Sequence, residues 1–225
     1  VGKAFVDNSV SMYDTEHEYN SILDWWREIH LKPLTEVTLK LIEWFQDFDS
    51  KVTINQRLKR KPQIIKKLKR KQSMRLSQMR DIGGCRAIFE SNEKLEDARN
   101  IIVTRSSKSK YFTIESIIDY RREGREESGY RALHIIVNRN GNMIEIQLRT
   151  EIQHKWAESI EQTSVICRKS LKEGEGPSEL IEYFKITSDA FSEVDQGKRP
   201  PTAMLKKILD FEEKIEPFIK FNRDI

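Results

Sequence analysis

Residues 145–150 read Glu-Ile-Gln-Leu-Arg-Thr and alternate polar with apolar side chains. Successive side chains of a β-strand point to opposite faces of the sheet, so this segment predicts a strand with one apolar face for a core. The other face carries Glu145, Gln147 and Arg149. For the segment alone, an edge strand with a solvated face explains the pattern as well as a site does. A carboxylate, an amide and a guanidinium side by side also suit a ligand that bears phosphates.

A second segment, residues 79–89, contains Gly83 and Gly84 and predicts a turn that runs into a short buried strand. Asp81 lies at its start. An Asp before a Gly pair is usually only a turn former. Combined with Glu145 on another strand, however, it would form a pair of carboxylates of the kind that binds Mg²⁺ together with substrate phosphates.

A third segment is densely basic and supplies cations for such phosphates. Arg57 and Lys59 are two residues apart and share a strand face, and Pro62 suits the first turn of a helix, whose free amides favour anions. The helix and its end carry five further cations, which are Lys66, Lys67, Lys69, Arg70 and Lys71. The outer lysines of such a run most often form a solvated face or a nonspecific polyanion patch. Arg57, Lys59 and the first turn of the helix together suit a triphosphate.

The fourth segment, residues 128–134, predicts another turn followed by a strand. Tyr130, Ala132 and His134 are expected to share one face of it. The aromatic ring is either part of the core or a surface on which a nucleobase stacks, with the imidazole close to a phosphate.

The composition bounds the protein class. The 225 residues include 40 Lys and Arg against 36 Asp and Glu, so the formal net charge is +4 and any polyanion site must come from clustering. Cys85 and Cys167 do not match a metal-binding spacing, and a reduced cytoplasm is the simplest setting. No apolar run approaches the roughly 20 residues that span a bilayer, so no membrane partner is expected. The length predicts one substantial domain with helical extensions.

The flanking segments have the periodicity of helices. We expect one helix from Asp14 to His30 and another after Pro33 to Phe48, each with an aromatic stripe that forms core or, less commonly, a partner surface. A further helix is expected from Trp156 toward Cys167, and two more over about 177–194 and 200–222.

Taken together, the segments resemble the RelA/SpoT family of nucleotide pyrophosphokinases over residues 52 to 163. The matching motifs are, in chain order, Arg57, Lys59 and Lys67; DIGGCRAIF at 81–89; Asp119 with Tyr120; SGYRALH at 128–134; and EIQLRT at 145–150 followed by His154, Trp156, Ala157 and Glu161. The resemblance implies an α+β fold with a mixed sheet of about five strands flanked by helices, related to nucleotidyltransferases. It divides the chain into an N-terminal helical extension at 1–50, a synthetase core at 51–168 and C-terminal helices at 169–225.

The resemblance also implies a reaction and its residues. The β,γ-pyrophosphate of ATP would pass to the 3′-hydroxyl of a purine nucleotide, GDP or GTP, with release of AMP. The implied roles are Asp81 and Glu145 as the catalytic Mg²⁺ pair, Arg57 and Arg86 on adenine, Lys59 and Lys67 on the ATP phosphates, Tyr130 stacked on the acceptor base, and Gln147, His134 and His154 near the acceptor.

Two departures leave the acceptor open. His154 stands where many family members have Asn, and the loop from Tyr120 to Ser128 lacks the Pro-Lys pair that alarmone-making relatives usually carry. Gly84 with Cys85, Ser128 and Arg131 look more like toxic small synthetases, some of which modify the 3′ CCA end of tRNA. An antitoxin or a second copy of the chain is then an expected partner. A non-catalytic nucleotide-binding regulator and a pure RNA-binding module are the alternatives from other classes.

Overall fold

The computed structural model describes residues 14–220. The described chain divides into two compact units. Unit 1 combines the residues up to Ala87 with Ala98–Ile117 and Ile135–Gln147, and unit 2 combines Ile88–Asp97, Ile118–His134 and the residues from Leu148 onward. Each unit is therefore built from segments that are far apart in the sequence.

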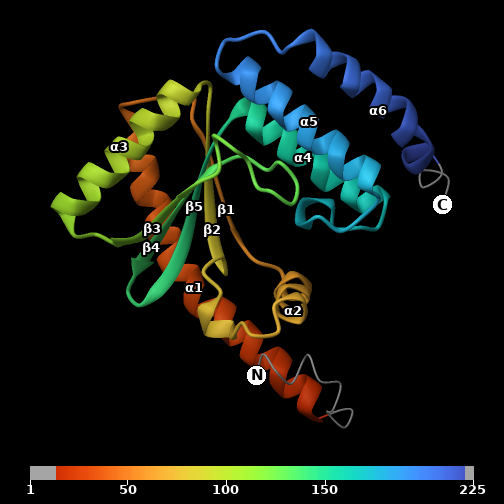
Figure 1. Ribbon diagram of the computed structural model, residues 1–225. Helices are drawn as coiled ribbons and strands as arrows, with labels where there is room; N and C mark the ends of the chain where they lie inside the picture. The colour runs from red at the N-terminus through yellow and green to blue at the C-terminus, as the bar shows by residue number, and fades with distance from the viewer. Residues whose placement is uncertain (1–13, 221–225) are drawn as a thin grey trace. The chain divides into compact units, whose positions relative to one another are not determined.

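Five strands form one sheet in the order β1-β2-β5-β4-β3 (Figure 1). Their bounds are β1 (Thr53–Leu58), β2 (Gly83–Phe89), β3 (Thr113–Asp119), β4 (Leu133–Arg139) and β5 (Asn142–Thr150). Asn140 and Gly141 connect β4 to β5 with φ values of 53° and 82°, as a two-residue hairpin turn requires. β5 is the central strand, so an edge position does not explain the polar residues at 145–149. The predicted α+β fold with a five-stranded mixed sheet is confirmed.

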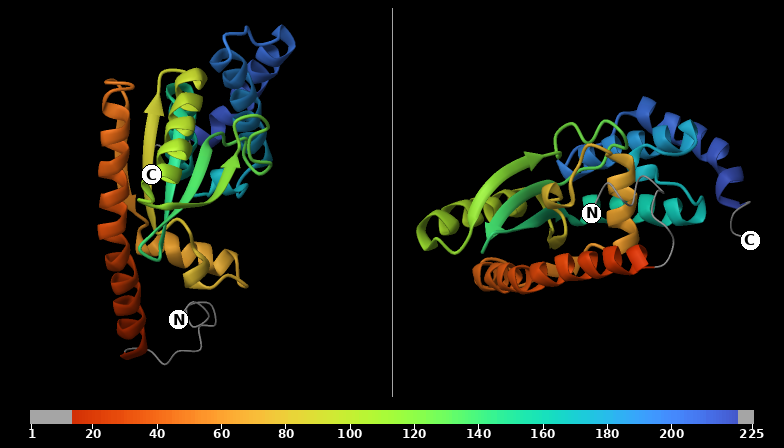
Figure 2. Two further views of the ribbon diagram at one scale, coloured as in Figure 1. Left: turned by 90° about the vertical axis from the view of Figure 1, so that its left-hand side faces the viewer. Right: turned by 90° about the horizontal axis from the view of Figure 1, so that it is seen from below.

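In unit 1, α1 (Asp14–Gln46) is one continuous helix that contains Pro33, as Figure 2 shows. The predicted break into two helices at Pro33 is therefore wrong. The apolar side of α1 is completely buried at Leu23, Val37, Leu41 and Phe45. Burial of this stripe provides the free energy that offsets the hydrogen bond lost at a proline inside a helix.

The contacts of α1 show which face of the sheet it covers. Leu34 on α1 lies 3.4 Å from the position of an ideal Cβ on Gly83 of β2, and the same Cβ would lie 2.8 Å from the Cδ1 atom of Ile144 on β5. Any side chain at Gly83 would therefore collide with the core. Gly83 and Gly84 lie inside β2 and not in a turn, so the sequence-based prediction of a glycine turn is wrong here. Close packing explains Gly83 instead.

Unit 1 contains two further helical segments, α2 (Lys61–Arg70) and η1 (Leu76–Gln78). A third helix, α3 (Asn92–Ser109), begins in unit 2 and ends in unit 1. Pro62 lies in the first turn of α2, as predicted. Ile64 and Leu68, four residues apart on α2, pack with Leu23, Met79 and Ile82 in one apolar cluster.

Unit 2 is mainly helical. Its remaining elements are α4 (Glu151–Ile166), η2 (Leu171–Glu173), α5 (Ser178–Asp195) and α6 (Thr202–Lys220). Thr150 caps α4, because its hydroxyl accepts a hydrogen bond from the Gln153 amide. The predicted helices toward Cys167 and over about 177–194 are confirmed. The helix predicted over about 200–222 is confirmed within the described chain, and residues 221–222 lie outside it. None of the described helices is long and apolar enough to cross a membrane.

Candidate active site

The two carboxylates of the predicted metal pair belong to neighbouring strands of unit 1. Asp81 lies two residues before β2, and Glu145 lies on β5, the strand next to β2. An ideal Cβ on Gly84 would lie 3.6 Å from the backbone oxygen of Glu145, so the two strands are in van der Waals contact there. Both carboxylate residues are half-buried.

Strand alternation shows which side of the sheet carries these groups. Cys85 on β2 and Ile144 and Ile146 on β5 are buried, whereas Arg86, Glu145 and Gln147 are half-buried. Gly83 and Ile144 face α1, so Arg86, Glu145 and Gln147 point to the opposite face. Gln147 donates a hydrogen bond from Nε2 to Oε2 of Glu145 at 2.5 Å, which fixes the orientation of the carboxylate.

Asp81 binds both of the lysines that were predicted to hold phosphates. Lys59 Nζ lies 2.8 Å from Oδ2, and Lys67 Nζ lies 2.9 Å from Oδ1. Burial alone would raise the pKa of Asp81, but the two ammonium groups hold the pKa below its usual value. Asp81 is therefore ionised at neutral pH, and three predicted site residues form one charged cluster.

The backbone holds this cluster in place. Arg27 of α1 donates a hydrogen bond from Nε to the carbonyl oxygen of Lys59 at 2.9 Å.

Arg57, at the end of β1, is exposed, and Arg86, on the adjacent strand β2, is half-buried. These two guanidinium groups, which were predicted to hold adenine, thus come from neighbouring strands of the same unit.

The donor atoms of the carboxylate pair suit a hard cation. Mg²⁺ is usually held by one or two carboxylates together with substrate phosphates, and Asp81 and Glu145 provide that set. Within residues 14–220, no group of three or more His, Cys, Asp and Glu side chains forms a site for a more enclosed metal. The donor set of the pair therefore fits Mg²⁺ with substrate, and Lys59 and Lys67 also contact the Asp81 oxygens.

Cys85, between Gly84 and Arg86, is not a candidate nucleophile. Its side chain is buried against α1, and burial raises the pKa of the Cys85 thiol to about 12, with a smaller contribution from the charge of Glu145. At neutral pH the sulfur is a thiol and not the thiolate that nucleophilic attack needs.

In unit 2, Tyr130 and His134 are in contact, but Tyr130 and Ala132 precede β4, so the prediction that the three residues share one strand face is wrong. The Tyr130 hydroxyl is 2.8 Å from Nε2 of His134, and Arg149 donates a hydrogen bond to the same hydroxyl at 2.7 Å. Tyr130 itself is 1% exposed and belongs to the core cluster of this unit. A base can stack on its ring only after a neighbouring group has moved.

Three cations surround that ring. The guanidinium carbons of Arg149 and Arg125 lie 4.9 Å and 5.6 Å from the ring centroid of Tyr130, and the Lys172 ammonium lies 4.5 Å from it. Lys172 also pairs with Glu161 at 2.8 Å. The pattern of residues 145–149 contained a signal for Arg149, but no sequence signal connects Lys172 to a tyrosine 42 residues earlier.

His154, the last predicted acceptor residue, lies on α4. Its Nε2 is 3.3 Å from a carboxylate oxygen of Glu158, one turn further along the helix. Its side chain is about one-fifth exposed.

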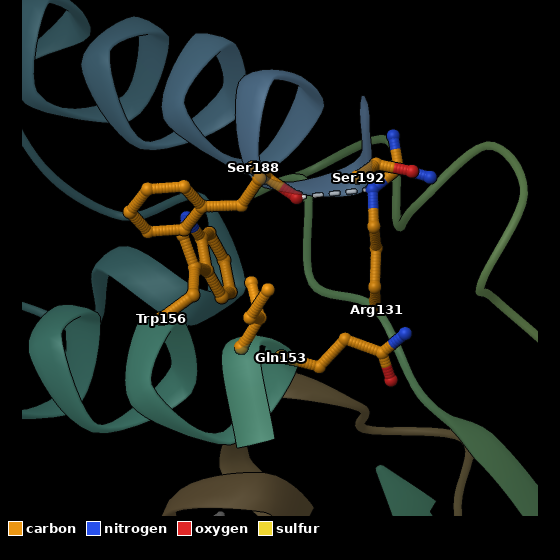
Figure 3. Close-up of a pocket in the computed structure, with 7 residues that line it drawn as sticks. Arg131, Gln153, Trp156, Ser188 and Ser192 are labelled. Carbon is orange, nitrogen blue, oxygen red and sulfur yellow. Dashed lines mark hydrogen bonds between the residues drawn. The ribbon is translucent and has the colours of Figure 1, made fainter. Parts of the chain in front are cut away.

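Arg131 has a structural task in unit 2. Its guanidinium donates hydrogen bonds to the carbonyl oxygens of Arg121 and Arg122, to the Ser188 hydroxyl and to the Asp189 carboxylate. Figure 3 shows Arg131 reaching toward Ser188 of α5 beside a cavity of about 10 Å³, the room that one water needs. Arg131 therefore ties the loop before β4 to α5.

Comparison with known proteins identifies the family. Residues 56–166 match the family model described as the region found in RelA / SpoT proteins. The chain belongs to the RelA/SpoT family. This RelA/SpoT segment includes every predicted site residue and ends before η2, so Lys172 lies outside it.

Solved structures share the fold. The small alarmone synthetase 1 from Bacillus subtilis bound to its product pppGpp is 22% identical, with a TM-score of 0.63 over 77% of this chain and 94% of that chain. The same synthetase bound to AMPCPP is 18% identical, with a TM-score of 0.55 over 89% and 100%. A GTP pyrophosphokinase family protein from Streptococcus pneumoniae is 17% identical, with a TM-score of 0.60 over 95% and 99%. No curated protein sequence matches this RelA/SpoT protein.

Proposed function

We propose that this RelA/SpoT-type pyrophosphokinase transfers the β,γ-pyrophosphate of ATP to the 3′-hydroxyl of a guanine nucleotide, GDP or GTP, and releases AMP. The observation that carries the proposal is the cluster of Asp81, Lys59 and Lys67 beside the strand that presents Glu145 and Gln147. The pppGpp and AMPCPP that occupy the Bacillus synthetase support the choice of a guanine acceptor and an ATP donor.

The donor half of the reaction uses residues of unit 1. Arg57 and Arg86 hold adenine between their planar groups, and Lys59 and Lys67 bind the phosphates. Because both lysines pair with Asp81 before ATP arrives, binding exchanges one set of partners for another and leaves Asp81 available as an oxygen ligand. Mg²⁺ held by Asp81 and Glu145 would neutralise charge on the phosphate oxygens.

Glu145 takes the proton of the reaction. Gln147 orients its carboxylate toward one face of the sheet, where an acceptor 3′-hydroxyl can transfer its proton to Oε1 or Oε2. The 3′-oxygen then bonds to the β-phosphorus, and the bond from that phosphorus to the oxygen bridging to the α-phosphate breaks. AMP leaves with the bridging oxygen and its electron pair, so atoms and charge balance.

Recognition of the acceptor base falls to unit 2 in this proposal. Tyr130 provides the stacking ring, and His134, whose Nε2 lies 2.8 Å from the Tyr130 hydroxyl, fixes its position. His154 is the other acceptor residue proposed for unit 2.

A second acceptor, the 3′ end of tRNA, is favoured by two features of the sequence. The loop from Tyr120 to Ser128 lacks the Pro-Lys pair expected for a nucleotide acceptor, and residues 50–80 carry a strong excess of positive charge. The enzyme would then be a toxin that blocks translation, with an antitoxin as its partner.

Transfer of label from γ-phosphate-labelled ATP, in the presence of Mg²⁺, distinguishes the acceptors. Separate reactions contain GDP, GTP, ATP or deacylated tRNA. Glu145→Gln should lower turnover by about 100-fold or more, because it removes the base and a metal ligand. Glu115→Gln is the matched control, since Glu115 is an exposed carboxylate on β3 of the same sheet.

Label on GDP or GTP that disappears in Glu145→Gln but persists in Glu115→Gln supports the proposal. Label on tRNA alone selects the second acceptor. Absence of label on every acceptor, with a folded protein by circular dichroism, contradicts the enzyme assignment to these residues and leaves a nucleotide-binding regulator.

A further inference from the structure

Positive charge in this chain is concentrated in one interval. Residues 50–80 contain 12 Lys and Arg and no Asp or Glu. With the other 28 of the 40 basic residues and all 36 acidic residues, the rest of the chain has a formal charge of −8. A net charge of +4 therefore conceals a strongly basic surface on an otherwise acidic protein.

Eight of the 12 basic residues of this interval fall into two groups. Lys59 and Lys67 point inward to Asp81, and Lys61 pairs with Asp24. A second group is exposed and consists of Lys66, Lys69, Arg70, Lys71 and Arg75. We call this second group the outer α2 surface. Its first three members are three and four residues apart on α2, so they share one face of the helix, opposite the buried Ile64 and Leu68.

A concavity lies at one end of the outer α2 surface. The segment that follows α2 borders an open, shallow concavity lined by Arg70, Lys71, Gln72, Ser73, Met74 and Gln78. Its cations suit phosphate oxygens, and its amide and hydroxyl groups can donate to or accept from a ribose 2′-hydroxyl. Favourable charge at the C-terminus of α2 explains the basic residues in the last helical turn, but it does not explain this lining.

The composition of the interval narrows the class of ligand. Residues 50–80 contain no Phe, Tyr or Trp, so this interval itself supplies no ring on which unpaired bases could stack. None of the large hydrophobic residues in this fully described interval is exposed, so no apolar side chain is available to enter a membrane. A double-stranded nucleic acid needs neither an aromatic ring nor an apolar side chain, because its bases are already paired and its phosphates face outward.

We propose that the outer α2 surface binds the sugar-phosphate backbone of double-stranded RNA. The surface uses none of the residues assigned to ATP or to the proton transfer. It lies in the same unit as the Asp81 cluster and on the same helix as Lys67, so an RNA bound there lies beside the donor site. Recognition is of backbone and shape and does not depend on base sequence.

Salt dependence is the expected signature of this binding. Each phosphate contact contributes about 0.9 to the slope of log affinity against log salt concentration. If four of the five cations make contacts, the apparent affinity should fall by about 100-fold between roughly 50 and 200 mM salt.

The test is fluorescence anisotropy with a labelled RNA hairpin whose stem has about 12 base pairs, measured on the full chain without ATP or Mg²⁺. The triple variant Lys69→Gln, Lys71→Gln, Arg75→Gln should bind at least about tenfold more weakly, with the salt slope reduced by about 2.7. The matched control is Arg199→Gln, Lys206→Gln, Lys207→Gln, which removes the same charges from exposed positions of unit 2. This control should bind as the unmodified chain does.

Three outcomes would overturn the proposal: hairpin binding by the triple variant as tight as by the unmodified chain, an equal loss in the control triple, and binding to anionic phosphatidylserine vesicles without binding to RNA. A DNA hairpin of the same sequence should bind more weakly than the RNA. Equal binding of DNA would overturn the assignment to RNA and leave a general polyanion surface.

The same variants separate this proposal from the proposed function. Pyrophosphate transfer to GDP should be unchanged in the triple variant, since none of its residues contacts Asp81, Glu145 or Tyr130. If pyrophosphate is transferred but no RNA binds, only the proposed RNA-binding surface is refuted. If RNA binds but no acceptor receives pyrophosphate, only the proposed enzyme function is refuted.

Discussion

Lys172 is the nearest of the three cations described over the Tyr130 ring. Its ammonium lies 4.5 Å from the ring centroid, in the position that a stacked base would need, and Glu161 holds it there from the other side. If Tyr130 binds the acceptor base, the ammonium has to leave the ring first, and the cation–π attraction of about 0.5–2 kcal/mol opposes binding.

Lys172→Ala should therefore lower the KM for the acceptor nucleotide by about three- to tenfold. The KM for ATP and the kcat should not change, because the donor residues lie elsewhere. Lys169→Ala, at an exposed position three residues earlier, is the control. An increase in acceptor KM would show instead that Lys172 binds the acceptor directly.

The two cysteines should differ in reactivity. Burial raises the pKa of both thiols, but Cys85 is fully buried and its pKa reaches about 12, whereas Cys167 is partly exposed. Iodoacetamide at about pH 8 should modify Cys167 in the folded protein and Cys85 only after denaturation, as mass spectrometry of the intact chain can show. Native modification of a Cys167→Ser variant would contradict the burial of Cys85.

At the scale of the elements, Asp195 at the end of α5 connects three segments of unit 2. Its Oδ2 atom accepts hydrogen bonds from Asn92 of α3, Thr150 before α4 and Gln153 of α4, at 2.8–3.0 Å. Thr150 and Gln153 are buried and are also the two residues that cap α4. One carboxylate oxygen thus fixes where α4 begins.

Asp195→Ala should destabilise the protein by about 2–3 kcal/mol, because it leaves buried donors without their acceptor. For a chain of this length, that corresponds to a fall in Tm of roughly 4–12 °C by differential scanning calorimetry. A decrease of less than about 1 °C would show that water replaces the carboxylate without loss.

Asp195→Asn is the informative companion variant. Burial raises the pKa of Asp195 above its ordinary value of 3.8, although its three donors act to lower the pKa. The carboxyl group therefore contributes stability below its unfolded pKa and loses it as the pH rises through the folded pKa. Asn does not titrate, so urea unfolding should show this variant gaining stability relative to the unmodified chain as the pH rises above the ordinary Asp pKa of 3.8. A constant difference would contradict the raised pKa.

Local patterns predicted the elements well and their contacts poorly. Alternation at 145–149 and the basic helix after Pro62 were sufficient to place Glu145, Gln147 and Lys67 on the right elements. The course of α1 through Pro33 was not predictable, because tertiary burial of its apolar stripe outweighs a local preference. The pairing of both lysines with Asp81, and of Lys172 with Tyr130, depends on which segments fold together, and no local pattern encodes that.

At the scale of the whole molecule, the units are interleaved along the chain. β2, β3, β4 and β5 each begin in one unit and end in the other, since four of the five unit boundaries fall inside them, after residues 87, 117, 134 and 147. Neither unit can be excised as one continuous segment. Unfolding of either unit would have to break strands that also belong to its partner unit.

The chain should therefore unfold in a single cooperative step. Three of the four tryptophans, Trp25, Trp26 and Trp44, belong to unit 1, and Trp156 belongs to unit 2. In a Trp156→Phe variant, tryptophan fluorescence reports on unit 1 alone, whereas far-ultraviolet circular dichroism reports on the helices of both units. The urea midpoints from the two signals should coincide within error in this variant and in the unmodified chain. Separate midpoints would show that the strands shared by the two units do not couple them, because unit 1 could then lose its structure while the α4–α6 helices of unit 2 remain folded.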